Sequence, residues 1–157
     1  MGRTILHDKR ETIARVEAEY SALDRAVRRI GTSGLDVAVP GFGARARIKR
    51  ERWLRKDALA HIVEWKRQQL RALRKEPSDP ELRGMRLHEK NAFFYRRWHR
   101  RRASEVVAYH REVGRDIRRA MRVLAPEYFA KRVSPQWPND LVGHSAEHRR
   151  RHLEEPS

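Results

Sequence analysis

Residues 53–65 read WLRKDALAHIVEW and form the first part of a helix that we expect to run from about residue 53 to residue 75. One face of this helix repeats every three or four positions. Its members are Leu54, Ala58, Ile62, Trp65, Gln69 and Leu73. The run Pro77-Ser78-Asp79-Pro80 then stops the pattern, because proline cannot continue a helix. His61 lies on this stripe in an apolar run, so the helix carries an imidazole toward the interior of the fold.

Three more helical patterns flank this one. The first covers roughly residues 8–30 and ends at Gly31 and Gly34; its stripe consists of Ile13, Val16, Tyr20, Leu23, Val27 and Ile30. The next begins near Leu82, and one side of it groups Leu87, Asn91, Phe94, Tyr95 and Trp98. We expect Ser104 to cap a restarted helix that continues to Leu124. The last helix opens at Pro138 and runs to His152, and Pro156 closes it.

These patterns predict an all-α fold, because no stretch alternates as a strand does and the helices are long enough to pack side by side. We expect a four-helix bundle whose third helix is kinked or split. The chain has 157 residues, enough for one core, so residues 1–157 should form a single domain. Residues 31–48 form a long connection between the first two helices, and such a segment crosses a bundle or covers a pocket mouth.

The composition is strongly basic and contains no cysteine. Lysine and arginine total 37 against 21 acidic residues, a formal net charge of +16. Most of these cations are arginine, which indicates either phosphate recognition or arginine-rich codon usage, and we favour codon usage. Without cysteine, any metal must be bound by histidine, carboxylates or water. The N-terminus lacks a secretory leader and no segment could span a bilayer, so we expect a soluble cytoplasmic protein without a membrane partner.

The histidines carry the sharpest functional hypothesis. His144, His148 and His152 recur every fourth residue, and residues four apart lie above one another on a helix. Together with His61 they could hold one divalent cation between two helices. The competing interpretations are an exposed basic tail around Arg149-Arg150-Arg151 and a core histidine at position 61 bound to a backbone carbonyl. We expect the remaining histidines to face solvent: His7, His88, His99 and His110.

Residues 53–65 also resemble the second-helix signature of the DinB/YfiT-like superfamily, W-x-x-K-D-x-x-x-H-x-x-x-W. Residues 143–152, GHSAEHRRRH, resemble its closing helix, in which E-H-x-x-x-H is common. The stretch EKNAFFY at 89–95, with SEVV at 104–107, is similar to the middle of the ClbS/DfsB-like branch. Leu54 departs from the family, where a Ser or Thr helix cap is usual, and leaves the start of the second helix open.

The resemblance implies a four-helix bundle with a metal in its groove, bound by His61, His148 and His152. His144 stands where this branch often has a polar residue, and it is an alternative or additional ligand, or a pocket residue. Related proteins include thiol transferases and the mycothiol-dependent maleylpyruvate isomerase, so a low-molecular-weight thiol is a candidate cofactor. The histidine set does not distinguish Zn from Ni or Fe.

Together these observations suggest a metal-dependent thiol transferase or hydrolase acting on a small electrophile, for detoxification or self-protection. Glu64 and Tyr95 are the candidate catalytic residues, although Glu64 fits a solvated helix position better. The expected pocket residues are Trp65, Asn91, Tyr95 and His144, while Trp98 and Tyr109 fit the core. Two alternatives stay open: a bundle that binds a ligand or toxin without turnover, and a basic protein that binds nucleic acid without sequence preference. A homodimer is also open.

Overall fold

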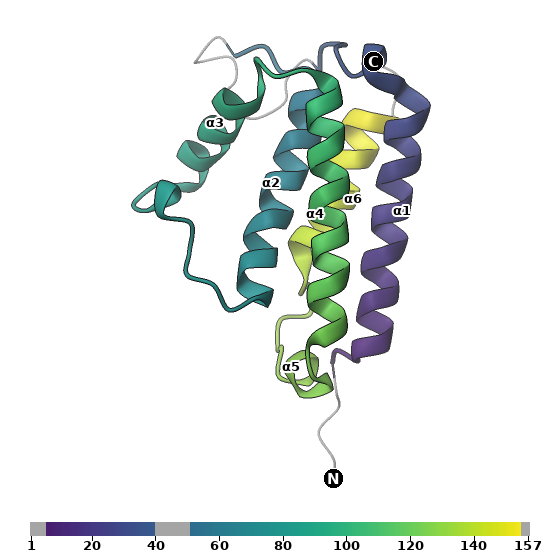
Figure 1. The fold of residues 1–157 in the computed structure, drawn as a ribbon, viewed down its shortest axis with the longest axis vertical. Coiled ribbons are helices and arrows are strands. Elements are labelled where there is room, and N and C mark those ends of the chain that lie inside the picture. The colour runs from purple at the N-terminus through teal and green to yellow at the C-terminus, as the bar shows by residue number, and fades with distance from the viewer. Residues whose placement is uncertain (1–5, 40–50, 155–157) are drawn as a thin grey trace.

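The computed structural model describes residues 6–39 and 51–154, and these are helical throughout apart from turns and one isolated bridge between Ala38 and Leu54 (Figure 1). The predicted all-α class is therefore confirmed. The α-helices are α1 (Lys9–Gly34), α2 (Arg55–Leu73), α3 (Leu87–Trp98), α4 (Ala103–Val123), α5 (Pro126–Ala130) and α6 (Gly143–His148). Short 3-10 turns cover Pro80–Leu82 and Asn139–Leu141, and α6 continues as a π-helix over Arg149–Glu154. None of the described helices has the length and apolar composition that crossing a membrane requires.

The core lies where α1, α2, α4 and the C-terminal segment pack side by side (Figure 1). Helix α4 packs against both α1 and α2, and α6 with its π-helical continuation packs against the same two helices. The largest fully buried apolar side chains are Leu23, Leu35, Leu59, Ile62, Leu73, Phe94, Met121, Phe129 and Leu141. Helix α3 leans away from the other helices and packs mainly on α2, so it forms a separate wall beside the core (Figure 1).

Several helix boundaries differ from the sequence-based expectation. The regular part of α1 ends at Gly31, as predicted, because its φ of 72° is accessible to glycine without strain. Ser104 is not an N-cap, since α4 already begins at Ala103. Pro138 does not open the last helix either: Val142 (φ −126°, ψ −77°) interrupts the chain after a 3-10 turn, and α6 starts at Gly143. Residues 40–48 of the predicted 31–48 connection, and Pro156, lie outside the described residues.

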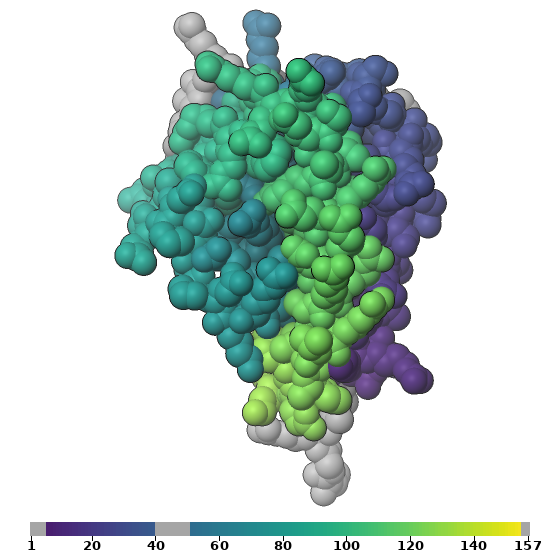
Figure 2. All heavy atoms as spheres, in the orientation of Figure 1, coloured from purple at the N-terminus to yellow at the C-terminus, as the bar shows by residue number. Residues whose placement is uncertain are grey.

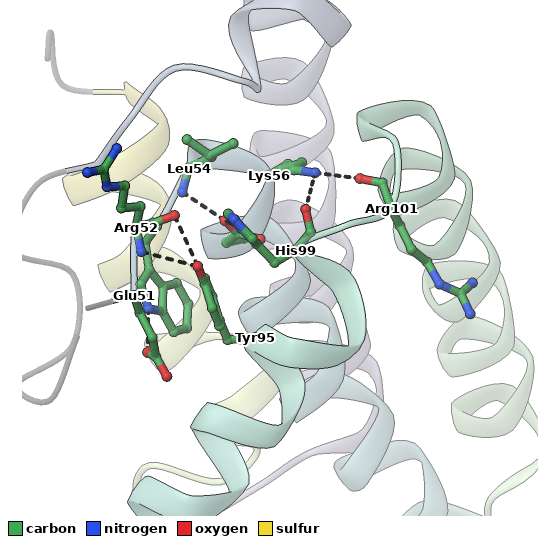
Figure 3. Close-up of polar contacts among 9 residues, drawn as sticks. Glu51, Arg52, Leu54, Lys56, Tyr95, His99 and Arg101 are labelled. Carbon is green, nitrogen blue, oxygen red and sulfur yellow. Dashed lines mark hydrogen bonds and ion pairs between the residues drawn. The ribbon is translucent and has the colours of Figure 1, made fainter. Parts of the chain in front are cut away.

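The first turn of α2 is joined to the α3–α4 junction by two polar side chains (Figure 3). Asp57 accepts a hydrogen bond from the Leu54 backbone N–H at 2.8 Å, so this carboxylate caps α2 where the family pattern has Ser or Thr. The same carboxylate lies 2.8 Å from Nδ1 of His99. Lys56 Nζ donates to the carbonyls of His99, at 2.6 Å, and of Arg101. The Lys-Asp pair of residues 53–65 therefore positions α3 relative to α2.

Two histidines that we expected to face solvent are buried. His7 lies 3% exposed, with its Nε2 2.7 Å from the Ser134 carbonyl oxygen. His110 lies 2% exposed, 3.1 Å from Asp24 and stacked on the Tyr20 ring. The polar neighbours of these residues in the sequence suggested exposure. For His110 the helical period gave the better signal, because positions four before and three after it are both buried valines.

Burial of His110 predicts that acid destabilises the fold. Loss of hydration lowers the pKa of His110 to about 4, against 6.5 for the free group. Between these values the unfolded chain binds the proton and the folded chain does not, so stability must fall as the pH drops from 6.5 toward 4. We expect His110→Phe to flatten this part of a urea-denaturation profile measured against pH. His88→Phe, a change on the outer part of α3, should leave the slope as it is; equal slopes in parent and His110→Phe would contradict the assignment.

Candidate metal centre

Three histidines from two helices meet beside the core. His61 of α2 and His144 and His148 of α6 each offer a nitrogen, and these nitrogens all lie within 4.8 Å of one another. The Nε2 atoms of His61 and His144 lie 3.3 Å apart. The imidazole centroids are 4.9 Å apart for His61 and His148 and 4.5 Å apart for His144 and His148. The sequence-predicted convergence of position 61 with the last helix is therefore present in the structure.

A buried ion pair holds α6 in the position that makes this cluster. Glu19 of α1 accepts hydrogen bonds from Ser145 Oγ at 2.8 Å and from the Arg149 guanidinium at 2.7 Å, and all three side chains are buried. Ser145 and Arg149 each directly follow one of the two histidines of α6 in the sequence. The two histidines are one helical turn apart, so they point the same way. Because Ser145 and Arg149 are bound to Glu19 of α1, both imidazoles are directed toward α2.

The structure brings together a different group of three histidines from the set that the resemblance implies. His152 stacks on His148, with ring centroids 5.6 Å apart, but it is not in the group whose nitrogens lie within 4.8 Å of one another; His144 completes that group instead. His152 lies in the π-helical segment Arg149–Glu154 that follows α6. His152 lines the same cavity farther along.

Burial keeps these imidazoles neutral, which is the form that binds a cation. Desolvation is the largest cause in each case. Together with the neighbouring histidines, it lowers the pKa of His61 well below its usual value and that of His144 to about 4. The pKa of His148 is lowered for the same reason.

The spacing of the cluster fits a tetrahedral cation. With metal–nitrogen bonds of about 2.0–2.1 Å, two ligands of a tetrahedral zinc ion lie about 3.3–3.4 Å apart, and the two Nε2 atoms of His61 and His144 are separated by 3.3 Å. The second nitrogen of His144, Nδ1, is buried and makes no hydrogen bond with any described residue. Three neutral nitrogens leave at least one coordination position open, as in catalytic rather than structural zinc sites.

The cluster forms one side of a cavity of about 490 Å³ between α2, α3 and the C-terminal segment. Trp65 and Asn91, both expected at a pocket wall, line it, and the Trp65 indole N–H donates to Asn91 Oδ1 at 2.9 Å. His144 lines it as well as joining the cluster. Sequence reasoning missed five further lining residues: Trp53, Leu87, Asn139, Asp140 and Arg151. Burial raises the pKa of Asp140 to about 6, so this carboxyl group of the cavity gains or loses a proton at a pH nearer to 7 than an ordinary aspartate does.

The two candidate catalytic residues lie elsewhere. Glu64 is completely buried; it forms a 2.9 Å ion pair with Arg97 and accepts a hydrogen bond from the Tyr109 hydroxyl. Tyr109 is in the core, as expected, and Glu64 ties α2 to α3 and α4 there. It is neither a solvated residue nor a group of the cavity. The period that places His61 inward puts position 64 inward as well, on the side of α2 that faces α3 and α4.

Tyr95 lies outside the cavity lining, with its hydroxyl beside the Arg52 backbone (Figure 3). Its ring stacks between Trp53, at 5.0 Å, and His99, at 4.5 Å, and its hydroxyl accepts from the Arg52 backbone N–H at 3.1 Å. It is not among the residues that line the cavity. Trp53, which does line it, packs edge-on against His61. Tyr95 therefore supports Trp53, and through it His61, rather than meeting a ligand.

Comparison of the chain with family models, with curated proteins and with solved structures finds no match. The geometry of the site is therefore the guide to its chemistry. That geometry combines three neutral imidazoles, a cavity with two tryptophans and a carboxyl group whose pKa is raised. This combination suits the polarisation of a bound molecule and the transfer of a proton to or from it.

Proposed function

We propose that this protein is a metal-dependent enzyme of the DinB/YfiT-like superfamily, built as a four-helix bundle, that acts on a small electrophilic compound. His61, His144 and His148 hold one divalent cation. The observation that carries the proposal is the meeting of three imidazoles from two helices within 4.8 Å at the side of a cavity. The packing of α1, α2, α4 and the C-terminal segment supports the bundle, and the match of residues 53–65 to the family signature supports the membership.

The residues of the cavity have separable tasks in this proposal. A divalent cation, when bound, supplies Lewis acidity that polarises a carbonyl and makes a water or thiol more acidic. The three histidines hold it in their neutral form, and the indoles of Trp53 and Trp65 exclude water from the cavity. Asp140, whose pKa is raised to about 6, holds or accepts a proton near neutral pH. Thiol transfer and hydrolysis both need these steps.

The test is metal analysis of protein purified without a histidine tag. We expect about one Zn, Ni or Fe ion per chain after loading and dialysis, because three neutral imidazoles bind one divalent cation and leave its remaining positions to water. The metal-loaded protein should then hydrolyse or thiolate small activated esters or epoxides faster than the chelator-treated protein. Absence of stoichiometric metal at neutral pH would contradict the proposal and favour a binding protein without turnover.

A second candidate function is binding to a phosphate backbone. Helix α4 runs across one face of the molecule (Figure 2), and its solvent-facing side carries Arg111, Arg115, Arg119 and Arg122, all exposed. Such a stripe attracts nucleic acid without sequence preference. If this is the function, duplex DNA should still bind at physiological salt, and His61→Ala should bind it as tightly as the parent. Binding that is lost below physiological salt in both proteins would be non-specific electrostatic adhesion.

A further inference from the structure

The hydrogen bond between Trp65 and Asn91 fixes which way the Asn91 amide faces. An indole N–H can only donate, so the atom of Asn91 that lies 2.9 Å from it must be the carbonyl oxygen Oδ1. The amide nitrogen Nδ2 is then on the other branch of the side chain. It makes no hydrogen bond with any residue in the described ranges. Asn91 thus enters the cavity as a donor whose orientation is set before any ligand binds.

Planar aromatic and aliphatic side chains lie near the Asn91 amide. Trp53 and Trp65 both line the cavity, Trp65 packs edge-on against Phe94 at 5.5 Å, and Leu87 lies one helical turn before Asn91 on α3. Aromatic side chains supported in this way offer rigid planar contact area at little entropic cost. The cavity volume of about 490 Å³ falls in the range of small-molecule sites.

In the metal-free protein, the charges in the cavity favour a neutral ligand over an ion. Asp140 is a partly buried carboxyl group, which repels anions when it is ionised. Arg151, the cation of the cavity lining, lies 3.8 Å from Glu147, and this pair offsets its charge. A neutral acceptor oxygen satisfies Asn91 without opposing either group. A ligand without an acceptor would leave the amide N–H unpaired on desolvation, which is costly.

We propose that the cavity binds a small neutral compound with a planar apolar body and a carbonyl group, and that Asn91 Nδ2 donates to the carbonyl oxygen. This inference deepens the proposed function and rests on it for one point, that the carbonyl carbon is the electrophilic centre of the substrate. Asn91 is then a substrate-binding residue, and Trp65 is a positioning residue that orients it. Recognition of the oxygen needs only the residues of this chain.

The test uses chelator-treated protein and benzamide as the probe, followed through the Trp65 indole N–H resonance, which Trp65→Phe identifies. We expect benzamide to shift this resonance saturably. Toluene has a similar planar body and no acceptor, and it should bind at least about tenfold more weakly because the Asn91 donor is left unpaired. Asn91→Asp keeps an oxygen for the indole N–H but removes the amide donor, so it should weaken benzamide binding at least about tenfold while the indole resonance stays in place.

Gln136→Glu is the control, because it makes the same amide-to-carboxylate change at an exposed residue that does not line the cavity. It should leave the benzamide dissociation constant within about twofold of the parent value, as expected for an amide that does not meet the ligand. Equal losses in the two variants, unchanged binding in Asn91→Asp, or equal binding of toluene and benzamide would each overturn the proposal. Since the protein is metal-free in this assay, failure of metal binding overturns the proposed function alone, and failure of benzamide binding overturns only the carbonyl site.

Discussion

His144→Ala is expected to weaken divalent-metal binding by more than about 100-fold, because a lost ligand should cost more than the 10- to 100-fold typical of residues that only support ligands. The reason is geometric. His144 approaches His61 to 3.3 Å and completes the group of three nitrogens within 4.8 Å. His61→Ala and His148→Ala should show the same loss. The measurement is competition with a chromophoric chelator at pH 7.5 on tag-free protein.

His152→Ala is the decisive comparison, since the family resemblance makes His152 a ligand and the structure places it outside the group of three. We expect it to weaken metal binding by no more than about tenfold, the lower end of the range for a residue that supports a ligand, because it stacks on His148. A large loss in His152→Ala together with a small one in His144→Ala would show that the family-like set binds the metal, and would require the π-helical segment to rewind.

Glu19→Ala is expected to lower the free energy of unfolding by about 3–5 kcal/mol, the usual cost of removing one partner of a buried ion pair. Glu19 is 6% exposed and Arg149 is 9% exposed, so the guanidinium would be left in the interior without its carboxylate. Buried Lys66 also depends on Glu19, because the nearby carboxylate opposes the effect of burial on its pKa. Urea denaturation at pH 7.5 measures the loss.

Glu17→Ala on the same helix is the control. Glu17 is half-exposed, and its nearest cation, Arg122, lies 3.9 Å away at the surface, so its removal should change stability by no more than about 0.5 kcal/mol. Glu19→Ala should also weaken metal binding, since Glu19 holds the residues beside His144 and His148. If Glu19→Ala unfolds at the same urea concentration as Glu17→Ala, the buried pair does not anchor α6.

Helix period was enough to place the histidine at position 61 inward and to align His144 with His148 on the last helix. Each prediction depended on local spacing: the stripe of residues 53–75, the glycine at 31 and the repeat of four between His144 and His148. The same period identified Trp65 and Asn91, which do line the cavity. Residues that support the cavity from behind could not be found in this way. Tyr95 shares the face of Asn91 in the sequence, yet Trp53 separates its ring from the ligand space.

Glu64, Asp140 and His152 show where local rules stop. Glu64 is charged, which usually means solvent, but Arg97 and Tyr109 arrive from distant parts of the chain and compensate its burial. Asp140 gains its raised pKa only from the segments that pack around it. His152 satisfies the repeat of four and still lies outside the group of three, although its ring stacks on His148.

The sequence by itself determined the all-helical class, the inward position of His61 and the presence of a histidine pair one turn apart, because these depend on periodicity within a helix. The tertiary structure alone decided which histidine is third, which carboxyl group shares the cavity and which way Asn91 faces. These depend on how distant segments meet: the Glu19–Arg149 pair sets the position of α6, and the Trp65 indole sets the Asn91 amide. Contacts between residues far apart in the chain leave no periodic trace in the sequence.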